Sequence, residues 1–184
     1  RGPLLGSRPP GSLIQHPDLY RLDQPTSPRP SPIGTEKADI MIHCSGRIKS
    51  RLARLLWDDT IERVACLIGD IEGEDYFVRD VLPARNEDYK PAEEFYISAA
   101  QMRGLTAEAQ RRGYFLLGVA HSHRPHHPSV PSEADIRYCR HAVNVVVHPA
   151  SAALTWFDQT GELGRETLSS TQAAPAMAPA LAFG

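Results

Sequence analysis

The stretch that most constrains the fold of this chain runs from Gly118 to Asp135 and reads GVAHSHRPHHPSVPSEAD. It begins inside an apolar run, Tyr114–Ala120, that is typical of a buried β-strand, and two histidines follow at the end of that strand, His121 and His123. Because side chains alternate between the two faces of a strand, both imidazoles project to the same side. Two imidazoles at this spacing can bind one metal ion.

A third ligand follows the proline-rich loop after these histidines. Ser132 is a typical N-cap for a short helix, and Asp135 lies in the first turn of that helix. The loop can fold back so that the Asp135 carboxylate joins the two imidazoles at the strand end. Two histidines and one carboxylate leave the fourth position of a zinc ion open to water, as in catalytic zinc sites. The sequence therefore predicts one Zn²⁺, with a bound water, held by His121, His123 and Asp135.

Hydrolysis at such a site also needs a base. Zinc lowers the pKa of its bound water from about 15.7 toward about 7, but a side chain must still take the proton and pass it to the leaving amine. Glu62 is the candidate, because it lies at the start of the nearly continuous apolar run Val64–Ile71, which predicts a strand buried on both faces. The alternative is a solvated carboxylate at a strand end.

The hydrophobic pattern predicts one α/β domain with a mixed sheet. Strands are expected at residues 39–44 and 64–71, and a further strand is expected directly after a turn at 72–74. Others are expected at 114–120, 142–148 and 152–157, with a weaker one at 165–168. Helices are expected at residues 45–59, 98–112 and 132–140, each starting at a serine that can cap it. Residues 83–97 are expected to leave the core as an excursion.

The ends of the chain differ from this domain. The 184 residues are enough for one domain with tails. Residues 1–37 hold half of the 16 prolines and show no sustained periodicity, so we expect a disordered or loosely docked arm there. The domain is assigned to residues 38–170 and an Ala/Pro-rich tail to residues 171–184.

Composition bears on partners and location. The net charge of −2 offers no broad electrostatic footprint for nucleic acid or an anionic membrane, so the basic face of the helix at 45–59 is interpreted as solvated. No apolar run approaches the roughly 20 residues of a membrane helix. Three cysteines without CxxC spacing, in apolar segments, indicate reduced buried thiols: Cys44, Cys66 and Cys139. These features together favour a cytoplasmic protein that binds neither nucleic acid nor a membrane.

The segment Glu62-Arg-Val-Ala-Cys-Leu-Ile-Gly69, followed by HSH at 121–123 and PSEAD at 131–135, resembles the JAMM/MPN+ zinc metallopeptidase family of prokaryotic type. The resemblance spans about residues 38–168. It implies a single MPN/JAB-type domain, α/β in class, with a curved mixed β-sheet flanked by helices in a cytidine-deaminase-like architecture. Members of the family cleave ubiquitin or ubiquitin-like proteins.

The resemblance also implies roles for single residues. Glu62 corresponds to the general base, and Ser132 to the residue that helps to stabilise the oxyanion of the tetrahedral intermediate. His121, His123 and Asp135 correspond to the zinc ligands. The excursion is similar to a family stretch that borders the substrate channel, on four matching residues: Asn86, Pro91, Phe95 and Ile97.

The loop before Ser132 departs from the family pattern. Eight residues, RPHHPSVP, separate His123 from Ser132 where the family usually has seven, and Arg124 stands where a proline is common. One extra loop residue costs little closure entropy, so Asp135 can still reach the metal. His126 and His127 leave a rival ligand assignment open, although both are interpreted as exposed loop residues, and His148 as a surface histidine at a strand end.

The function implied is a zinc-dependent peptidase or isopeptidase that cleaves at the C-terminal tail of a ubiquitin or a ubiquitin-like, sulfur-carrier-like protein. The substrate tail is expected to add as a strand beside residues 83–97. The alternative is a non-catalytic MPN-type scaffolding or binding module. The oligomeric state and the partner's identity stay open.

Overall fold

The computed structural model describes residues 40–58 and 60–169. The arm expected at residues 1–37 and the tail expected at 171–184 lie outside the described residues. Within the described residues, no helix is long and apolar enough to cross a membrane.

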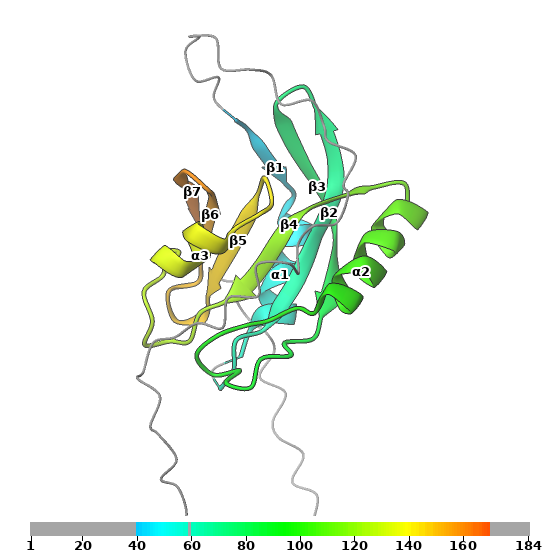
Figure 1. Ribbon diagram of the computed structural model, residues 1–184. Coiled ribbons are helices and arrows are strands. Elements are labelled where there is room, and N and C mark those ends of the chain that lie inside the picture. The colour runs from blue at the N-terminus through cyan, green and yellow to red at the C-terminus, as the bar shows by residue number, and fades with distance from the viewer. Residues whose placement is uncertain (1–39, 59, 170–184) are drawn as a thin grey trace, which may run out of the picture. The chain divides into compact units, whose positions relative to one another are not determined.

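A mixed seven-stranded sheet with three α-helices makes up the described part of the chain (Figure 1). The strands are β1 (Ile42–Cys44), β2 (Val64–Glu72), β3 (Asp75–Ala84), β4 (Phe115–Ser122), β5 (Asn144–His148), β6 (Ala153–Asp158) and β7 (Gly161–Thr167). The helices are α1 (Gly46–Leu56), α2 (Ala99–Arg111) and α3 (Glu133–Tyr138), with a 3-10 turn at Pro149–Ser151. The strand order is β1-β3-β2-β4-β5-β6-β7, in which the pairs β1/β3 and β4/β5 are parallel and the other pairs antiparallel. The predicted α/β class with a curved mixed sheet is confirmed.

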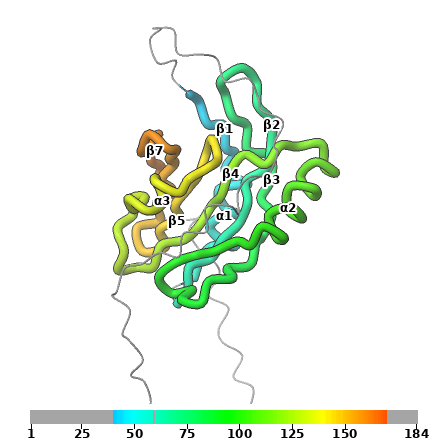
Figure 2. Tube along the Cα trace, in the orientation of Figure 1, coloured from blue at the N-terminus to red at the C-terminus, as the bar shows by residue number. Residues whose placement is uncertain are grey.

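The helices cover both faces of the sheet (Figures 1 and 2). Helix α1 buries an apolar stripe against one face, where Leu52 and Leu56 join a core that includes Leu67 and Leu154. Helices α2 and α3 lie on the opposite face. There Ile136 of α3 packs against a smaller buried cluster of Cys139, Val146 and Phe157. The sheet is therefore a central layer with apolar side chains on both faces.

Serine caps start all three helices, as predicted. The Ser45, Ser98 and Ser132 hydroxyls accept hydrogen bonds from backbone N–H groups of the first turns at 3.4, 3.2 and 3.1 Å. Helix α3 ends at Tyr138, two residues before the predicted end, because Cys139 leaves the helical conformation with φ −58° and ψ 122°. Its backbone N–H still closes the last turn onto the Asp135 carbonyl.

Two glycines, one in β2 and one in β4, allow close approaches between neighbouring backbones of the sheet. A Cβ on Gly69 would lie 1.8 Å from the Phe77 carbonyl oxygen, and a Cβ on Gly118 of β4 would lie 1.5 Å from the Val143 carbonyl oxygen. Irregularities in register occur beside these glycines, between Leu67 and Gly69. Only glycine therefore allows the backbones to meet there.

The prediction that β2 is buried along its whole length is wrong at one end. Residues 64–69 are buried, but Ile71 is 42% exposed. The reason is that β4 starts opposite Gly69, at Phe115, so the last part of β2 pairs with β3 alone. The three cysteines are free, as predicted, but only Cys66 and Cys139 are buried, whereas Cys44 is partly buried. Burial raises the pKa of the Cys66 thiol to about 12.

Candidate metal centre

The end of β4 brings His121 and His123 to the same side, as predicted. His121 pairs in register with Val64 of β2 and Val146 of β5, and its neighbours leave it 1% exposed. His123 is 5% exposed and continues the strand pattern by donating its backbone N–H to the Val147 carbonyl at 3.0 Å. The two Nε2 atoms lie 3.2 Å apart. Both imidazoles are thus buried with the same nitrogen directed to one point.

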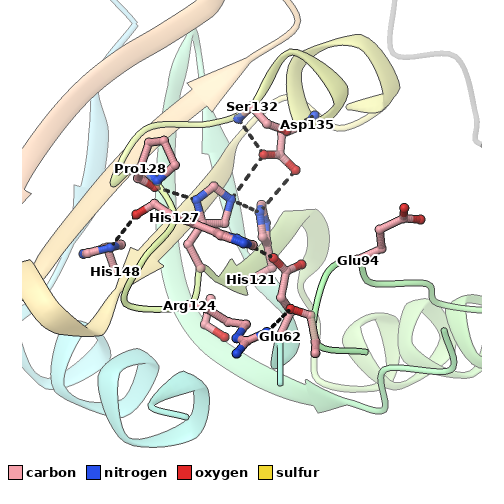
Figure 3. A network of polar contacts seen from close by, with 12 residues as sticks. Glu62, Glu94, His121, Arg124, His127, Pro128, Ser132, Asp135 and His148 are labelled. Atoms are coloured by element: carbon pink, nitrogen blue, oxygen red, sulfur yellow. Dashed lines mark hydrogen bonds and ion pairs between the residues drawn. The ribbon is translucent and has the colours of Figure 1, made fainter. Parts of the chain in front are cut away.

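Asp135 reaches that point from the start of α3 (Figure 3). Its Oδ1 lies 3.2 Å from His121 Nε2 and its Oδ2 lies 3.4 Å from His123 Nε2. The Oδ2 atom also accepts the Ser132 backbone N–H at 2.7 Å, which closes a capping box. Helix capping therefore fixes the carboxylate beside both imidazoles.

Among the described residues, the side chains grouped closely enough to hold a metal ion are His121, His123 and Asp135, whose candidate ligand atoms lie within 4.8 Å of one another. Imidazole nitrogens and a carboxylate oxygen are donors that zinc accepts. The rival assignment through His126 or His127 is not supported, since neither belongs to this group.

Hydrogen bonds prepare these side chains for a cation. His123 Nδ1 donates to the Pro128 carbonyl at 2.7 Å, which leaves the Nε2 lone pair directed at the group. Burial opposes charge on His123, yet without a metal ion the hydrogen bonds to Asp135 and Pro128 outweigh it, so its pKa is raised, and a bound cation would take the place of the Nε2 proton. Burial likewise opposes ionisation of Asp135, but the charge of His121 and hydrogen bonds from both histidines and Ser132 hold its pKa far below the usual range. The carboxylate is therefore in the ionised form that binds a metal.

Glu62 lies directly before β2 and is buried beside this group. It is 5% exposed, so its interpretation as a solvated carboxylate is wrong. Burial raises the pKa of Glu62 to about 7, while the nearby charges of His123 and Arg124 lower it and those of Asp135 and Glu94 raise it. A carboxyl group with such a pKa can both take up and release a proton near neutral pH.

The excursion at residues 83–97 holds Glu62 in place through hydrogen bonds to the Glu62 backbone. The Glu62 N–H donates to the Pro91 carbonyl at 2.6 Å, and its carbonyl accepts from Asn86 Nδ2 at 2.8 Å. The same amide donates to the Glu94 carbonyl at 3.0 Å and accepts the Tyr96 N–H at 3.1 Å. Asn86 is therefore the residue that joins the excursion to Glu62. Sequence reasoning noted it only through the family resemblance.

Phe95 connects the excursion to the metal centre itself. Its ring centroid lies 4.6 Å from that of His121, and the ring of Phe157 meets the same imidazole edge-on at 6.3 Å. Two aromatic rings thus contribute to the burial of His121, which is 1% exposed.

Three consecutive carbonyls of the loop at 124–131 are bonded to buried side chains. His148 Nε2 donates to His127 O at 2.9 Å, His123 Nδ1 to Pro128 O at 2.7 Å, and Thr155 Oγ1 to Ser129 O at 2.7 Å. The prediction of a surface position for His148 is wrong, because this contact and its bonds to Ser151 leave it 6% exposed. No periodicity in the sequence marks His148 or Thr155 as loop supports.

The loop places two of its side chains near Glu62. His126 is exposed, as predicted. The prediction that His127 is exposed is wrong, because its side chain is only 29% exposed and its Nδ1 lies 3.7 Å from Glu62 Oε1. Arg124 donates to the Ala92 carbonyl at 3.3 Å, and its Nε is buried with no hydrogen-bond partner. The loop with the extra residue therefore contacts the excursion and lies over the Glu62 carboxylate (Figure 3).

Ser132 is exposed at the opening of the group. Its hydroxyl oxygen accepts the Asp135 N–H at 3.1 Å, so the hydroxyl proton is not used in that bond. Capping the helix and donating a hydrogen bond to a ligand are compatible for this side chain.

The family model of the prokaryotic homologs of the JAB domain matches residues 48–163. The chain belongs to this family, as the resemblance in the sequence indicated. No curated protein matches the chain.

Two solved structures are similar to the chain. A protein from Desulfitobacterium hafniense, known from its solution structure, is 22% identical with a TM-score of 0.53, over 70% of this chain and 90% of that chain. A protein from Salinibacter ruber (strain DSM 13855) is 25% identical with a TM-score of 0.43, over 66% of this chain and 84% of that chain. The first likeness supports the fold and carries nothing about activity.

Proposed function

We propose that this protein is a zinc-dependent peptidase that cleaves at the C-terminal tail of a ubiquitin-like protein, acting on a peptide or isopeptide bond in the cytoplasm. The observation that carries the proposal is the buried Glu62, with its pKa raised to about 7, beside the group of His121, His123 and Asp135. Membership of the JAB family supports it.

In the proposed mechanism His121, His123 and Asp135 would hold the zinc ion, which when bound would supply a Lewis acid and a water of lowered pKa. Glu62 accepts the proton of the attacking water on its carboxylate and passes it to the leaving amine. The Ser132 hydroxyl donates a hydrogen bond to the oxyanion that develops on the scissile carbonyl. The raised pKa of Glu62 suits both halves of this proton transfer.

The substrate tail is proposed to lie extended beside residues 83–97. Such a tail forms main-chain hydrogen bonds along its length and needs few side-chain contacts. Asn86 would hold this border of the channel and the base together, since its amide bonds to the Glu62 and Glu94 carbonyls.

A non-catalytic binding module is the second candidate. It is favoured by the loop with the extra residue, which sets the His127 imidazole 3.7 Å from the Glu62 carboxylate, where an attacking water would have to be activated. In such a module the same site would bind a tail without cutting it.

The test is cleavage of fusions in which a ubiquitin-like protein carries a C-terminal extension. Zinc-loaded wild-type protein is expected to cut the fusion, and Glu62→Gln is expected to keep its zinc and lose about 10²-fold or more in rate. Glu74→Gln is the matched control, because it removes an exposed carboxylate in the turn between β2 and β3 that the mechanism does not use. Full zinc occupancy with undiminished cleavage by Glu62→Gln would exclude the assigned mechanism. Bound zinc with no cleavage by the wild-type protein or by either variant would favour the binding module.

A further inference from the structure

A cavity of about 930 Å³ is lined by α1, β1, β3 and Tyr114, and by none of the residues of the metal centre. Four of its lining residues are arginines: Arg47, Arg51, Arg54 and Arg79. We call it the arginine pocket. Among its lining residues Asp80 is the one acidic side chain.

The charges of the arginine pocket are unbalanced. Asp80 already pairs with two guanidinium groups, those of Arg51 and Arg112. Arg79 pairs with Asp70 at 2.8 Å. Arg47 and Arg54 are exposed, and no described residue forms a hydrogen bond or an ion pair with either side chain. Two cations are thus left to attract an anionic ligand.

The floor of the pocket is built from stacked groups. The imidazole of His43 lies flat on the ring of Phe77, with centroids 4.2 Å apart and planes 6° apart. The guanidinium of Arg79 lies 5.1 Å from the centroid of that ring. Because Asp70 also holds Arg79, this floor is ordered before any ligand arrives.

The arrangement of the arginines suits an extended chain. Arg47, Arg51 and Arg54 occupy positions i, i+4 and i+7 of α1, so they share one face over about 10 Å of helix axis. In an extended peptide, side chains on one side recur about every 6.6 Å, so acidic residues at alternate positions can meet this row.

Strand β1 supplies a backbone for such a chain. It lies at one edge of the sheet and pairs only with β3 among the described strands. Its residues His43 and Cys44 line the arginine pocket. An extended peptide can therefore add to an open strand edge while its acidic side chains reach the arginines.

We propose that the arginine pocket binds an acidic stretch of polypeptide in an extended conformation. A nucleic acid is the less favoured ligand, because its binding needs many phosphate contacts, whereas two arginines are unpaired here and the whole chain has a net charge of −2. This binding is independent of zinc and of peptide cleavage.

The test uses fluorescence anisotropy with the metal-free full chain and a labelled ten-residue peptide carrying glutamate at alternate positions. The acidic peptide is expected to bind in a salt-sensitive manner, and the same peptide with glutamine is expected to bind at least 10-fold more weakly. Arg47→Ala combined with Arg54→Ala is expected to weaken binding by at least 10-fold. Arg103→Ala combined with Arg137→Ala, which removes two exposed helical arginines elsewhere, is the matched control and is expected to bind as wild type.

A second measurement keeps the test decisive if the double variant is less stable. Amide chemical shifts of wild-type protein are expected to change at residues 42–54 and 77–80 when the acidic peptide is added. Equal binding by the double variant, shifts confined to the metal centre, or tighter binding of a single-stranded oligonucleotide of equal charge would each overturn the proposal. Because cleavage is not measured, these results are separate from the fate of the proposed peptidase.

Discussion

The carboxylate of Asp135 serves helix α3 and the metal centre together. Its Oδ2 accepts the Ser132 N–H at 2.7 Å, while Oδ1 lies 3.2 Å from His121 Nε2. The start of a helix is therefore also the element that orients a metal ligand. This arrangement explains why a Ser-x-x-Asp pattern after a loop is informative, because capping geometry is local and can be predicted from four residues.

Glu62 is predicted to make the stability of the metal-free protein depend on pH. Its pKa is raised to about 7 by burial, from about 4.3 in the unfolded chain, so the folded state binds the extra proton between these values. Stability contributed by this group is thus complete below about pH 4 and is lost as the pH rises through about 7. Glu62→Gln does not titrate, so its advantage over wild type should grow across this window to on the order of 3–4 kcal/mol at pH 8.

The measurement is chemical unfolding of both proteins in the presence of a chelator at several pH values. A difference in the free energy of unfolding that stays constant from pH 4 to pH 8 would show that Glu62 is not held in a desolvated position.

At the scale of elements, the loop at 124–131 is held by the side chain that directly follows β4 and by side chains of β5 and β6. Thr155 is fully buried and donates to the Ser129 carbonyl, so Thr155→Val keeps the volume and leaves that carbonyl without its donor. We expect a loss of about 1–3 kcal/mol in the free energy of unfolding and faster amide exchange at His127, whose N–H bonds to the Arg124 carbonyl. Unfolding and hydrogen exchange followed by mass spectrometry measure both.

The control for this change is Thr106→Val on α2, where the hydroxyl bonds to the Met102 carbonyl one helical turn earlier. This hydroxyl lies on another element and makes no contact with the loop carbonyls, so amide exchange in the loop should stay as in wild type. If Thr155→Val left loop exchange unchanged, the carbonyl contacts would not be what orders the loop.

The close packing of β2 on β3 leads to a second prediction for an element. Gly69→Ala would place a methyl group 1.8 Å from a backbone carbonyl, so we expect a loss of more than about 3 kcal/mol or failure to fold. Gly104→Ala is the contrasting change, since nothing lies within 4 Å of a Cβ at that helical position. It should raise stability by about 0.5–1 kcal/mol. Thermal melts of the two variants check the predicted loss of stability for Gly69→Ala and the predicted gain for Gly104→Ala. A mild effect of Gly69→Ala would contradict the close approach.

The order of helices and strands was predictable from the sequence, because caps and alternation are local properties. The ends of elements were less so: β2 becomes exposed at Ile71 only because β4 begins at Phe115. The burial of His148 was missed for a similar reason. Its exposure depends on a loop carbonyl 21 residues away in the chain, and no local pattern encodes that contact.

At the scale of the whole molecule, the candidate centre is assembled from three separate parts of the chain. The end of β4 and the start of α3 contribute the metal group, and Glu62 approaches from the entry to β2. The sequence pattern predicted these side chains as the site, but it did not predict which residues hold Glu62 in place. Asn86 and the loop at 124–131 do so through tertiary contacts, which a linear pattern does not contain.

Zinc stoichiometry tests the central claim most directly. Native mass spectrometry of the zinc-saturated chain is predicted to show one zinc ion per chain, kept by Glu62→Gln and lost by His123→Ala and by Asp135→Asn, because three ligands form the site and the base is not among them. A zinc ion retained at full occupancy after both His121 and His123 are replaced, or no zinc on the wild-type chain, would contradict it.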